Sequence, residues 1–490
     1  MIYPSKNEFI KLAKGHNLIP VYKEIMADFE TPLSCFMKID NGRYSYLLES
    51  VEKGEKLGRY SFLGSDPSLV FQSKGKRIQI SEFGKTRTFL TKKDPLYEIK
   101  KLSENYKFAQ VKGLPRFCGG FVGYMGYETV RFFERLPKAN YDDLKLPDTV
   151  FLLTDSILIF DHLERVIKIV SNAAVKKSPK ASYRQAEEKI LRIESLLKKE
   201  IALKKAKKRT VKLSVSSNMT KNKFKETVRK AKSYIKKGDV IQVVLSQRLK
   251  IKLNSDALTV YRALRHINPS PYMFYLNLNG VKLVGSSPEI MVRTENKIVE
   301  VRPIAGTRRR GRDAEEDESL AKELLADPKE RAEHIMLVDL GRNDIGRVCR
   351  YETVKVNELM TIEKYSHVMH IVSDVTGTLE KNKDLFDVIR ATFPAGTVTG
   401  APKIRAMEII DELENVARGP YAGCVGYFSF SGNEDFCITI RTIVVKGDYA
   451  YIQAGAGIVN DSKPEGEYKE TLNKARAMIK AIEDAEKGLD

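Results

Sequence analysis

Two pairs of glutamates have a spacing that would place both carboxylates of each pair on one side of a helix. Glu330 and Glu333 are three residues apart, and Glu467 and Glu470 repeat that spacing near the C-terminus. Side chains at positions i and i+3 share a helical face. Two such pairs facing one another would form an oxygen-rich site of the kind that binds Mg²⁺. Because glutamates on helices usually face solvent, the spacing alone leaves a plain surface role open as well.

His370 and the Gly306–Thr307 pair are further residues whose types could carry chemistry. His370 lies in an alternating apolar segment from His367 to Ser373, where a histidine more often makes a hydrogen bond within the core. A neutral imidazole beside a substrate can also shuttle a proton at physiological pH. Gly306 and Thr307 could offer a backbone N–H and a hydroxyl to an anion, or simply begin a basic loop. The patterns leave these interpretations open.

The stretch from Phe393 to Glu470 combines small residues with an arginine suited to an anion. Residues 394–403 form a turn rich in glycine and threonine, and residues 454–459 read Ala-Gly-Ala-Gly-Ile-Val. Small residues let a ligand approach the backbone, and free N–H groups in a turn attract anions. Arg441 is expected in an alternating strand, and a fixed guanidinium suits a carboxylate. We predict a site for a small-molecule anion on a sheet. The spacing before Lys403 does not match a nucleotide-binding phosphate loop.

Hydrophobic periodicity and turn signals predict the elements that must position these residues. Asn268–Met273 is expected to be a rigid extended loop because it contains two prolines. Pro402 is expected at the first position of its helix. Helices are predicted over 8–12, 182–201, 224–235, 258–265, 314–340 and 404–413, and strands over 45–50, 59–64, 150–160, 240–247, 274–278, 283–285 and 298–301, with 166–170 pairing to 150–160 as a hairpin.

Length and composition indicate a multidomain globular protein. The 490 residues suit two or three domains, and a lysine-rich run at 198–212 suggests a boundary. We predict an N-terminal domain over 1–172, a helix and linker over 173–215, and a second domain over 216–486. The apolar runs are too short to span a membrane, and the N-terminal residues carry no signal-peptide pattern.

The formal charge of +20 raises the alternative of a nucleic-acid-binding protein. The excess consists mainly of dispersed lysines, and no nucleic-acid-binding motif accompanies it, so we expect no nucleic-acid partner. The five cysteines lack paired spacing, which argues against a disulfide framework or zinc site and favours a reducing cytoplasm.

Cys118 is followed by two glycines, a pattern that partly matches the nucleophile turn of a glutaminase. Class I glutaminases carry their nucleophile in a Gly-x-Cys-x-Gly turn and also use a His-x-Glu pair. Here Arg116 replaces the first glycine, and the His162–Glu164 pair falls in strand-like sequence close by. We therefore expect Cys118 to be a buried core thiol.

Several longer segments, taken together, resemble the chorismate-utilising enzymes, and within them the anthranilate synthase component I group. The N-terminal half contributes LLESVEKGEKLGRYSFLG from residue 47 and GGFVGYMGYE from residue 119. Further matching segments are NPSPYM, RPIAGTRRRG, EHIMLVDLGRNDIGRV, YSHVMHIVSDVTG, FPAGTVTGAPKIRAMEIIDELE, GYFSF, CITIRT and AGAGIV.

The resemblance implies an α+β fold in which two interwoven domains contain large antiparallel sheets flanked by helices. It also implies conversion of chorismate and ammonia to anthranilate and pyruvate, through aminodeoxyisochorismate, as the first committed step of L-tryptophan synthesis. Because the chain has no glutaminase triad, a separate glutamine amidotransferase subunit (component II) is expected to supply the ammonia. L-Tryptophan is expected to act as a feedback inhibitor.

The same resemblance implies roles for particular residues. Mg²⁺ would be held by Glu333 and Glu470, with Glu330 and Glu467 assisting through water. Glu289 would protonate the departing C4 hydroxyl, and His370 would act in the loss of pyruvate. Arg441 would pair with the enolpyruvyl carboxylate, within a substrate site formed by Gly306, Thr307, Thr397, Tyr421, Arg441, Gly455, Ala456 and Gly457. The L-tryptophan pocket would comprise Leu47, Glu49, Ser50, Pro271, Tyr272 and Met273.

Two positions distinguish branches of the family. Relatives that add water carry a lysine where this sequence has Gln242. Relatives that make aminodeoxychorismate carry a nucleophilic lysine where this sequence has Ala305. Neither residue can replace its lysine, so ammonia attack at C2 is the expected chemistry. Aminodeoxychorismate synthase component I, an enzyme of folate synthesis, is the alternative.

Overall fold

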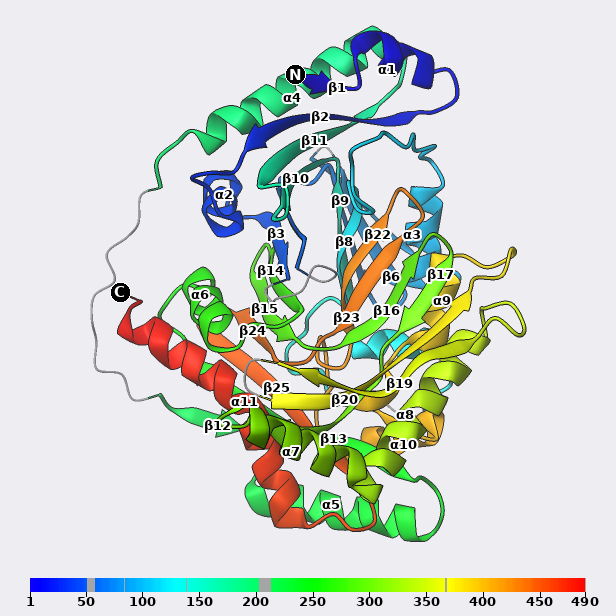
Figure 1. Ribbon diagram of the computed structural model, residues 1–490, viewed down its shortest axis with the longest axis vertical. Helices are drawn as coiled ribbons and strands as arrows, with labels where there is room; N and C mark the ends of the chain where they lie inside the picture. The colour runs from blue at the N-terminus through cyan, green and yellow to red at the C-terminus, as the bar shows by residue number, and fades with distance from the viewer. Residues whose placement is uncertain (51–57, 83, 138, 202–212, 366–367, 490) are drawn as a thin grey trace.

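The protein contains two large antiparallel sheets flanked by helices, which confirms the predicted α+β fold (Figure 1). The computed structural model describes residues 1–50, 58–82, 84–137, 139–201, 213–365 and 368–489. The first sheet has the order β1 (Ile2–Tyr3), β2 (Leu18–Met26), β11 (Val166–Ala174), β10 (Ser156–Asp161), β4 (Tyr60–Ser65), β3 (Tyr44–Glu49), β14 (Tyr272–Leu278), β15 (Val281–Ser287), β24 (Thr442–Lys446), β25 (Tyr449–Ile458), β13 (Gln242–Lys252) and β12 (Val215–Ser217), with β21 (Gly400–Ala401) beside β13.

The second sheet also joins distant parts of the chain. Its order is β18 (Ile304–Arg309), β20 (Val368–Thr378), β17 (Ile298–Val301), β16 (Ile290–Glu295), β23 (Glu434–Ile438), β22 (Cys424–Ser429), β8 (Gly120–Met125), β9 (Thr149–Thr154), β5 (Leu69–Lys74), β6 (Arg77–Glu82) and β7 (Lys85–Leu90), with β19 (Lys355–Lys364) beside β20.

Both sheets mix strands from the N-terminal and C-terminal parts of the chain. In the first sheet β3 pairs with β14, placing Glu49 opposite Met273. In the second sheet β8 pairs with β22, placing Gly123 opposite Gly426. The interwoven arrangement is thus confirmed, while the boundaries at 172 and 215 remain a prediction.

A shared apolar core joins the facing surfaces of the two sheets. It contains Phe62 and Phe274 from the first sheet and Val122 and Tyr427 from the second. The rings of Phe62 and Tyr427 meet edge to face, with their centroids 6.2 Å apart.

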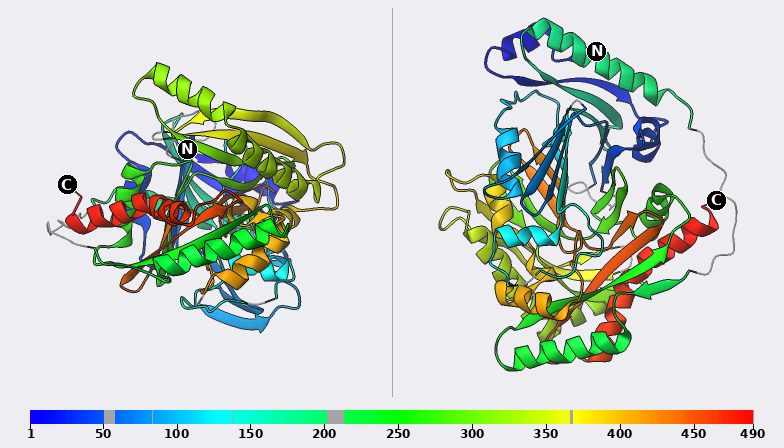
Figure 2. Two further views of the ribbon diagram at one scale, coloured as in Figure 1. Left: turned by 90° about the horizontal axis from the view of Figure 1, so that it is seen from below. Right: turned by 180° about the vertical axis from the view of Figure 1, so that it is seen from behind.

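Helices cover the other faces of the sheets. Helix α4 packs on β11 at one end of the molecule, and α5 packs on β13 at the other (Figures 1 and 2). No described helix is long and apolar enough to cross a membrane. The helices are α1 (Lys6–Leu12), α2 (Pro32–Ile39), α3 (Pro95–Ser103), α4 (Pro179–Leu197), α5 (Lys221–Lys236), α6 (Ala257–Ile267), α7 (Ala314–Ala326), α8 (Pro328–Gly346), α9 (Leu385–Thr392), α10 (Lys403–Leu413) and α11 (Pro464–Lys487), with short 3₁₀ turns η1 (Tyr127–Phe132) and η2 (Gly396–Val398).

Some predicted elements differ from the structure for identifiable reasons. The segment 314–340 forms two helices, because Pro328 cannot continue a helix and Asp327 caps α8 by accepting from Glu330 N. The segment 150–160 forms β9 and β10, which belong to different sheets. Pro402 occupies the N-cap of α10, with an extended ψ of 139°, rather than the first helical position.

Two of the places where the chain crosses between the sheets are adjacent. The chain passes from β15 to β16 through Pro288 and Glu289, and from β23 to β24 through residues 439–441. The crossings are tied together because Ile438 N donates to Glu289 O at 3.0 Å and Ser286 N donates to Arg441 O at 3.2 Å. Arg441 therefore does not lie within a strand as predicted; its φ of +50° turns the chain between the sheets.

Candidate functional site

His370 lies on β20, directly opposite Thr307 on β18. Its Nδ1 atom is 2.8 Å from Gly306 O and 3.1 Å from Thr307 Oγ1. Gly306 has a φ of +66°, and a Cβ atom there would lie 3.1 Å from Glu330 Oε2. A glycine is therefore needed both for the backbone conformation and for the close approach of the carboxylate.

The surroundings of His370 favour a neutral imidazole. Burial lowers its pKa, and the nearby Arg441 charge acts in the same direction, although the hydrogen bond to Gly306 opposes them. Donation from Nδ1–H to Gly306 O leaves Nε2 unprotonated and able to accept a proton. His367, the other histidine of this segment, lies outside the described residues.

Arg441 is a half-buried cation whose charge has little compensation from other side chains. Its Nη1 donates to Lys474 O at 3.2 Å, and burial lowers its pKa, opposed by Tyr421 and Glu470. Among the residues that the structure describes, no carboxylate lies within ion-pair distance of the Arg441 guanidinium. Burying a charge without a partner is costly, so this guanidinium is poised for an anion.

Tyr421 and the small residues of β25 lie against one another. A Cβ atom on Gly455 would come 2.6 Å from Tyr421 Oη, and one on Gly457 would come 2.5 Å from Gln242 Nε2. Burial raises the pKa of Tyr421 to about 12, so its hydroxyl stays protonated. Ala456 points into the core on the opposite side, as the alternation along a strand requires.

Glu289 is a buried acid at the first sheet crossing. Burial raises its pKa to about 7, although Thr397 and Lys474 lower it. Glu289 and Thr397 both line a cavity of about 40 Å³. A carboxyl group with a pKa near neutrality can donate a proton at physiological pH.

The four predicted metal-binding glutamates approach the same region but make separate contacts. Gln242 Nε2 donates to Glu333 Oε1 at 3.0 Å, and Arg308 lies 3.3 Å from Glu330 Oε1. Lys474 Nζ lies 2.8 Å from Glu470 Oε1. Burial raises the pKa of Glu467, with the neighbouring Glu470 charge acting in the same direction.

The donor chemistry of these glutamates suits Mg²⁺, whereas their present contacts do not form a closed binding site. Within the described ranges, no three His, Cys, Asp or Glu side chains gather closely enough to hold a metal ion. Glu330 and Glu470 contact cationic side chains, which a divalent ion would have to replace. The magnesium assignment therefore remains a prediction.

Lys474 is a residue of this region that the sequence analysis did not single out. Its Nζ donates to Gly455 O at 3.1 Å as well as contacting Glu470, and its own carbonyl accepts from Arg441. It lies four residues after Glu470 on α11, so helical spacing could have suggested the ion pair. Its contact with β25 depends on how α11 packs.

A second cavity, of about 300 Å³, lies where β3 and β14 meet the second sheet. Ser50 Oγ is buried there and has no hydrogen-bond partner among the described residues. Leu47 instead packs in the core of the first sheet. The other five residues predicted for the inhibitor pocket all line this cavity: Glu49, Ser50, Pro271, Tyr272 and Met273.

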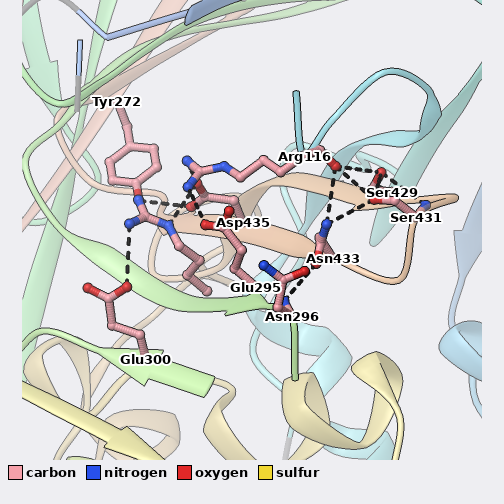
Figure 3. Close-up of polar contacts among 10 residues, drawn as sticks. Arg116, Tyr272, Glu295, Asn296, Glu300, Ser429, Ser431, Asn433 and Asp435 are labelled. Carbon is pink, nitrogen blue, oxygen red and sulfur yellow. Dashed lines mark hydrogen bonds and ion pairs between the residues drawn. The ribbon is translucent and has the colours of Figure 1, made fainter. Parts of the chain in front are cut away.

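The wall of this second cavity carries a polar network of which the sequence analysis identified only Tyr272 (Figure 3). Arg116 and Arg293 both contact Asp435 Oδ2, at 2.9 and 3.1 Å, and Tyr272 Oη donates to Asp435 Oδ1 at 2.8 Å. Arg116 also contacts Glu295 at 2.9 Å. These residues come from distant segments, so no local spacing indicates their association.

Cys118 is a buried thiol, as predicted. Burial raises its pKa to about 12, and its carbonyl accepts from Asn172 Nδ2 at 2.8 Å. A nucleophilic cysteine needs the opposite shift, toward the thiolate.

Comparison with known proteins gives consistent matches over nearly the whole chain. Residues 44–480 match the family of chorismate binding enzymes. "Anthranilate synthase component 1" of Acetivibrio thermocellus is 51% identical, with 99% of each chain covered. The protein of the same name from Aquifex aeolicus (strain VF5) is 50% identical, with 98% of each chain covered. The crystal structure of anthranilate synthase component I from Streptococcus pneumoniae TIGR4 has a TM-score of 0.77 at 34% identity, covering 93% of this chain and 98% of that one.

Proposed function

The chain belongs to the chorismate-binding enzyme family, and from this membership we propose that it is the synthase subunit that converts chorismate and ammonia to anthranilate, pyruvate and water. The observation that carries the proposal is the half-buried Arg441, whose guanidinium lacks a carboxylate partner among the described residues. Chorismate carries two carboxylates, and one of them would supply the missing charge. The names of the full-length relatives support the same activity.

The first half of the reaction replaces the C4 hydroxyl of chorismate by attack of ammonia at C2. Hydroxide is a poor leaving group, so it must receive a proton as it departs. Glu289 is suited to this role because burial raises its pKa to about 7, so a large fraction is protonated at neutral pH. The product of this step is aminodeoxyisochorismate.

The second half removes pyruvate and makes the ring aromatic. A base takes the proton from C2, the bond from the ring to the enolpyruvyl oxygen breaks, and the group leaves as enolpyruvate. Enolpyruvate then takes up a proton at its methylene carbon and becomes pyruvate, so the proton removed from C2 is balanced. His370 is suited to accept the proton because its imidazole is held neutral, with Nδ1 directed to Gly306 O.

Ala305 and Gln242 support ammonia as the external nucleophile. Ala305 lies on β18 next to Gly306 and cannot form a covalent adduct with the substrate. Gln242 donates to Glu333, and an amide cannot act as the base that activates water. These residues distinguish the proposal from an aminodeoxychorismate synthase or an isochorismate synthase.

The decisive experiment incubates the protein with chorismate, an ammonium salt and Mg²⁺ at alkaline pH. We expect anthranilate, detected by its fluorescence, together with an equal amount of pyruvate. Chorismate consumption that gives aminodeoxychorismate without anthranilate would assign the alternative branch. Absence of chorismate consumption would contradict the proposal altogether.

We further propose that Glu333 and Glu470 bind Mg²⁺, with Glu330 and Glu467 assisting through water. The ion, when bound, would neutralise the ring carboxylate of the substrate. Glu470→Ala should weaken Mg²⁺ binding by about 100-fold or more, measured by titration calorimetry, and lower activity in parallel. Glu465→Gln is the matched control, since Glu465 lies on the same helix and is paired with Lys221. An unchanged Mg²⁺ affinity in Glu470→Ala would contradict the assignment.

A glutamine amidotransferase subunit is the proposed source of ammonia. Free ammonia is scarce at neutral pH, and the buried Cys118 thiol is unsuited to glutamine hydrolysis. The isolated protein should therefore form anthranilate when an ammonium salt is supplied. With glutamine as the nitrogen source, it should form anthranilate only after the partner subunit is added.

The second cavity is proposed to bind L-tryptophan as a feedback inhibitor. Its aromatic lining suits an indole ring, and its acidic and basic side chains suit an amino acid's charged groups. Ser50 Oγ, buried without a partner among the described residues, could donate to such a ligand. Inhibition would require that tryptophan bind two states of the enzyme with different affinities.

Ser50→Phe tests this pocket by filling it. The bulky ring should abolish inhibition by L-tryptophan while leaving chorismate turnover within about two-fold of the parent, because the substitution lies outside the substrate site. Ser50→Thr, which keeps the hydroxyl, is the control and should remain inhibited. Equal inhibition of Ser50→Phe and the parent would show that the pocket is misplaced.

A further inference from the structure

Arg418, between α10 and β22, is a fully buried guanidinium with partners on three sides. Its Nε and Nη2 atoms donate to both oxygens of Glu414, at 3.0 and 2.7 Å. Its Nη2 also donates to Val244 O at 2.7 Å, and its Nη1 donates to Val398 O at 2.8 Å. The side chain is 1% exposed. Such a contact set uses the planar fork of arginine, which a lysine ammonium cannot reproduce.

These partners belong to the segments that carry the candidate substrate site. Val398 follows Thr397 in the chain, and Val244 lies opposite Gly457 in the β13–β25 pair. Glu414 extends the connection, because its Oε1 accepts from both the N–H and the hydroxyl of Ser246, at 2.8 Å each. Ser246 lies opposite Gly455 on the same pair of strands.

Arg418 also contacts Tyr421 directly. Its guanidinium carbon lies 5.4 Å from the centroid of the Tyr421 ring and 4.9 Å from that of Tyr127. The backbone nearby is held as well, since the N–H groups of Arg418 and Gly419 donate to the Glu128 carboxylate at 2.8 and 2.9 Å. The turn that leads to Tyr421 is therefore fixed through both main chain and side chain.

A contribution to stability does not by itself explain the buried ion pair of Arg418 and Glu414. A buried ion pair often contributes no more stability than well-packed apolar residues would, because both charges lose their hydration. What it does supply is a defined relative position for the groups it joins. Here it joins the 396–398 turn and Tyr421 to β13, which lies far from both in the chain.

We propose that Arg418, supported by Glu414, is a positioning residue that sets Thr397, Tyr421 and Gly455–Gly457, together called the cradle, in register around the bound substrate. Arg418 itself does not touch the substrate; it acts through the carbonyls and the ring that it holds. This inference rests on the proposed assignment of those residues to chorismate.

Arg418→Lys and Arg418→Met test the proposal together. Lysine keeps the charge beside Glu414 but cannot hold both carbonyls, so the cradle should shift and the KM for chorismate should rise. A misplacement of about 1 Å can cost about 100-fold, so we expect a loss of kcat/KM of about 10- to 100-fold for lysine and more for methionine. Melting temperature and circular dichroism, measured alongside, establish that each variant is folded.

The split between KM and kcat distinguishes positioning from simple stabilisation. Partial unfolding would lower the amount of active enzyme and hence the apparent kcat, but would leave KM unchanged. Arg390→Met is the matched control, because Arg390 pairs with Asp94 at 3.0 Å between α9 and α3, away from the cradle. If folded Arg418→Lys keeps the parental KM, the positioning role is overturned. If the parent protein itself fails to convert chorismate, the proposed function fails instead.

Discussion

Replacing Glu289 with glutamine should lower kcat for anthranilate formation by about 10²- to 10⁴-fold, the usual contribution of a general acid. Glutamine has nearly the same shape but no proton to give to the departing hydroxyl. Glu289 is buried at the crossing from β15 to β16, where it lines a cavity with Thr397. Because glutamine has nearly the same shape, the substitution should leave the fold intact. Stopped or continuous fluorescence assays of anthranilate at saturating chorismate measure the effect.

The pH dependence of the parent should identify Glu289 as that acid. Because burial raises its pKa to about 7, the protonated fraction falls as the pH rises through about 7. At a constant concentration of free ammonia, kcat should therefore decline above this pH in the parent. The residual activity of Glu289→Gln should lack this decline.

The same shift affects stability in a defined direction. A group whose pKa is raised on folding adds stability below its usual pKa of 4.5, and this contribution is lost as the pH rises through about 7. Glu289→Gln should thus gain in melting temperature relative to the parent between about pH 5 and pH 8. Glu434→Gln is a matched control, since Glu434 is also buried, with a raised pKa, but contacts Thr294 rather than the cradle. Equal kcat losses in the two variants would argue against a role for Glu289 as acid.

Arg441→Met should lower kcat/KM for chorismate and at the same time raise the stability of the free protein. Loss of the guanidinium removes the partner of a substrate carboxylate, which typically costs about 2–5 kcal/mol. This corresponds to a decrease of about 30- to 4,000-fold in kcat/KM. The free protein should become more stable by about 1–3 kcal/mol, because a half-buried cation without a carboxylate partner among the described residues has been replaced by an apolar side chain.

Denaturant unfolding and chorismate kinetics on the same samples test both halves of this prediction. Arg390→Met provides the contrast, because its ion pair with Asp94 already compensates the charge. That variant should lose a little stability and keep its kcat/KM. If Arg441→Met were destabilised with unchanged kinetics, the guanidinium would serve the fold rather than an anionic substrate.

Local sequence was sufficient to predict elements whose partners lie nearby in the chain. Helices such as α5 and α6 follow from apolar residues at helical spacing, and the hairpin of β10 and β11 follows from two apolar runs separated by a short turn. Gly306, Thr307 and His370 were predicted from motifs, and the structure places them together on adjacent strands. Their residue types already limit the chemistry, because only certain side chains can move a proton or hold a carboxylate.

The local sequence pattern gave a wrong prediction where one apolar run forms two strands that pair with distant strands in different sheets. The apolar segment 150–160 reads as one strand, yet β9 pairs with β5 and β8 whereas β10 pairs with β4 and β11. Arg441 was expected in a strand because the residues around it alternate between polar and apolar types. Its position between β23 and β24 depends on those strands joining different sheets, which a short window cannot show.

The sequence by itself therefore determined the inventory of reactive groups, the family resemblance and the elements stabilised by local periodicity. Only the tertiary structure decided that Glu289 and Arg441 occupy neighbouring crossings, that Arg441 is left without a carboxylate among the described residues, and that Arg116, Arg293 and Asp435 form one wall of a cavity. The physical reason is that burial and charge compensation depend on which distant surfaces pack together. Pairing between strands hundreds of residues apart sets those neighbours, and spacing along the chain does not encode it.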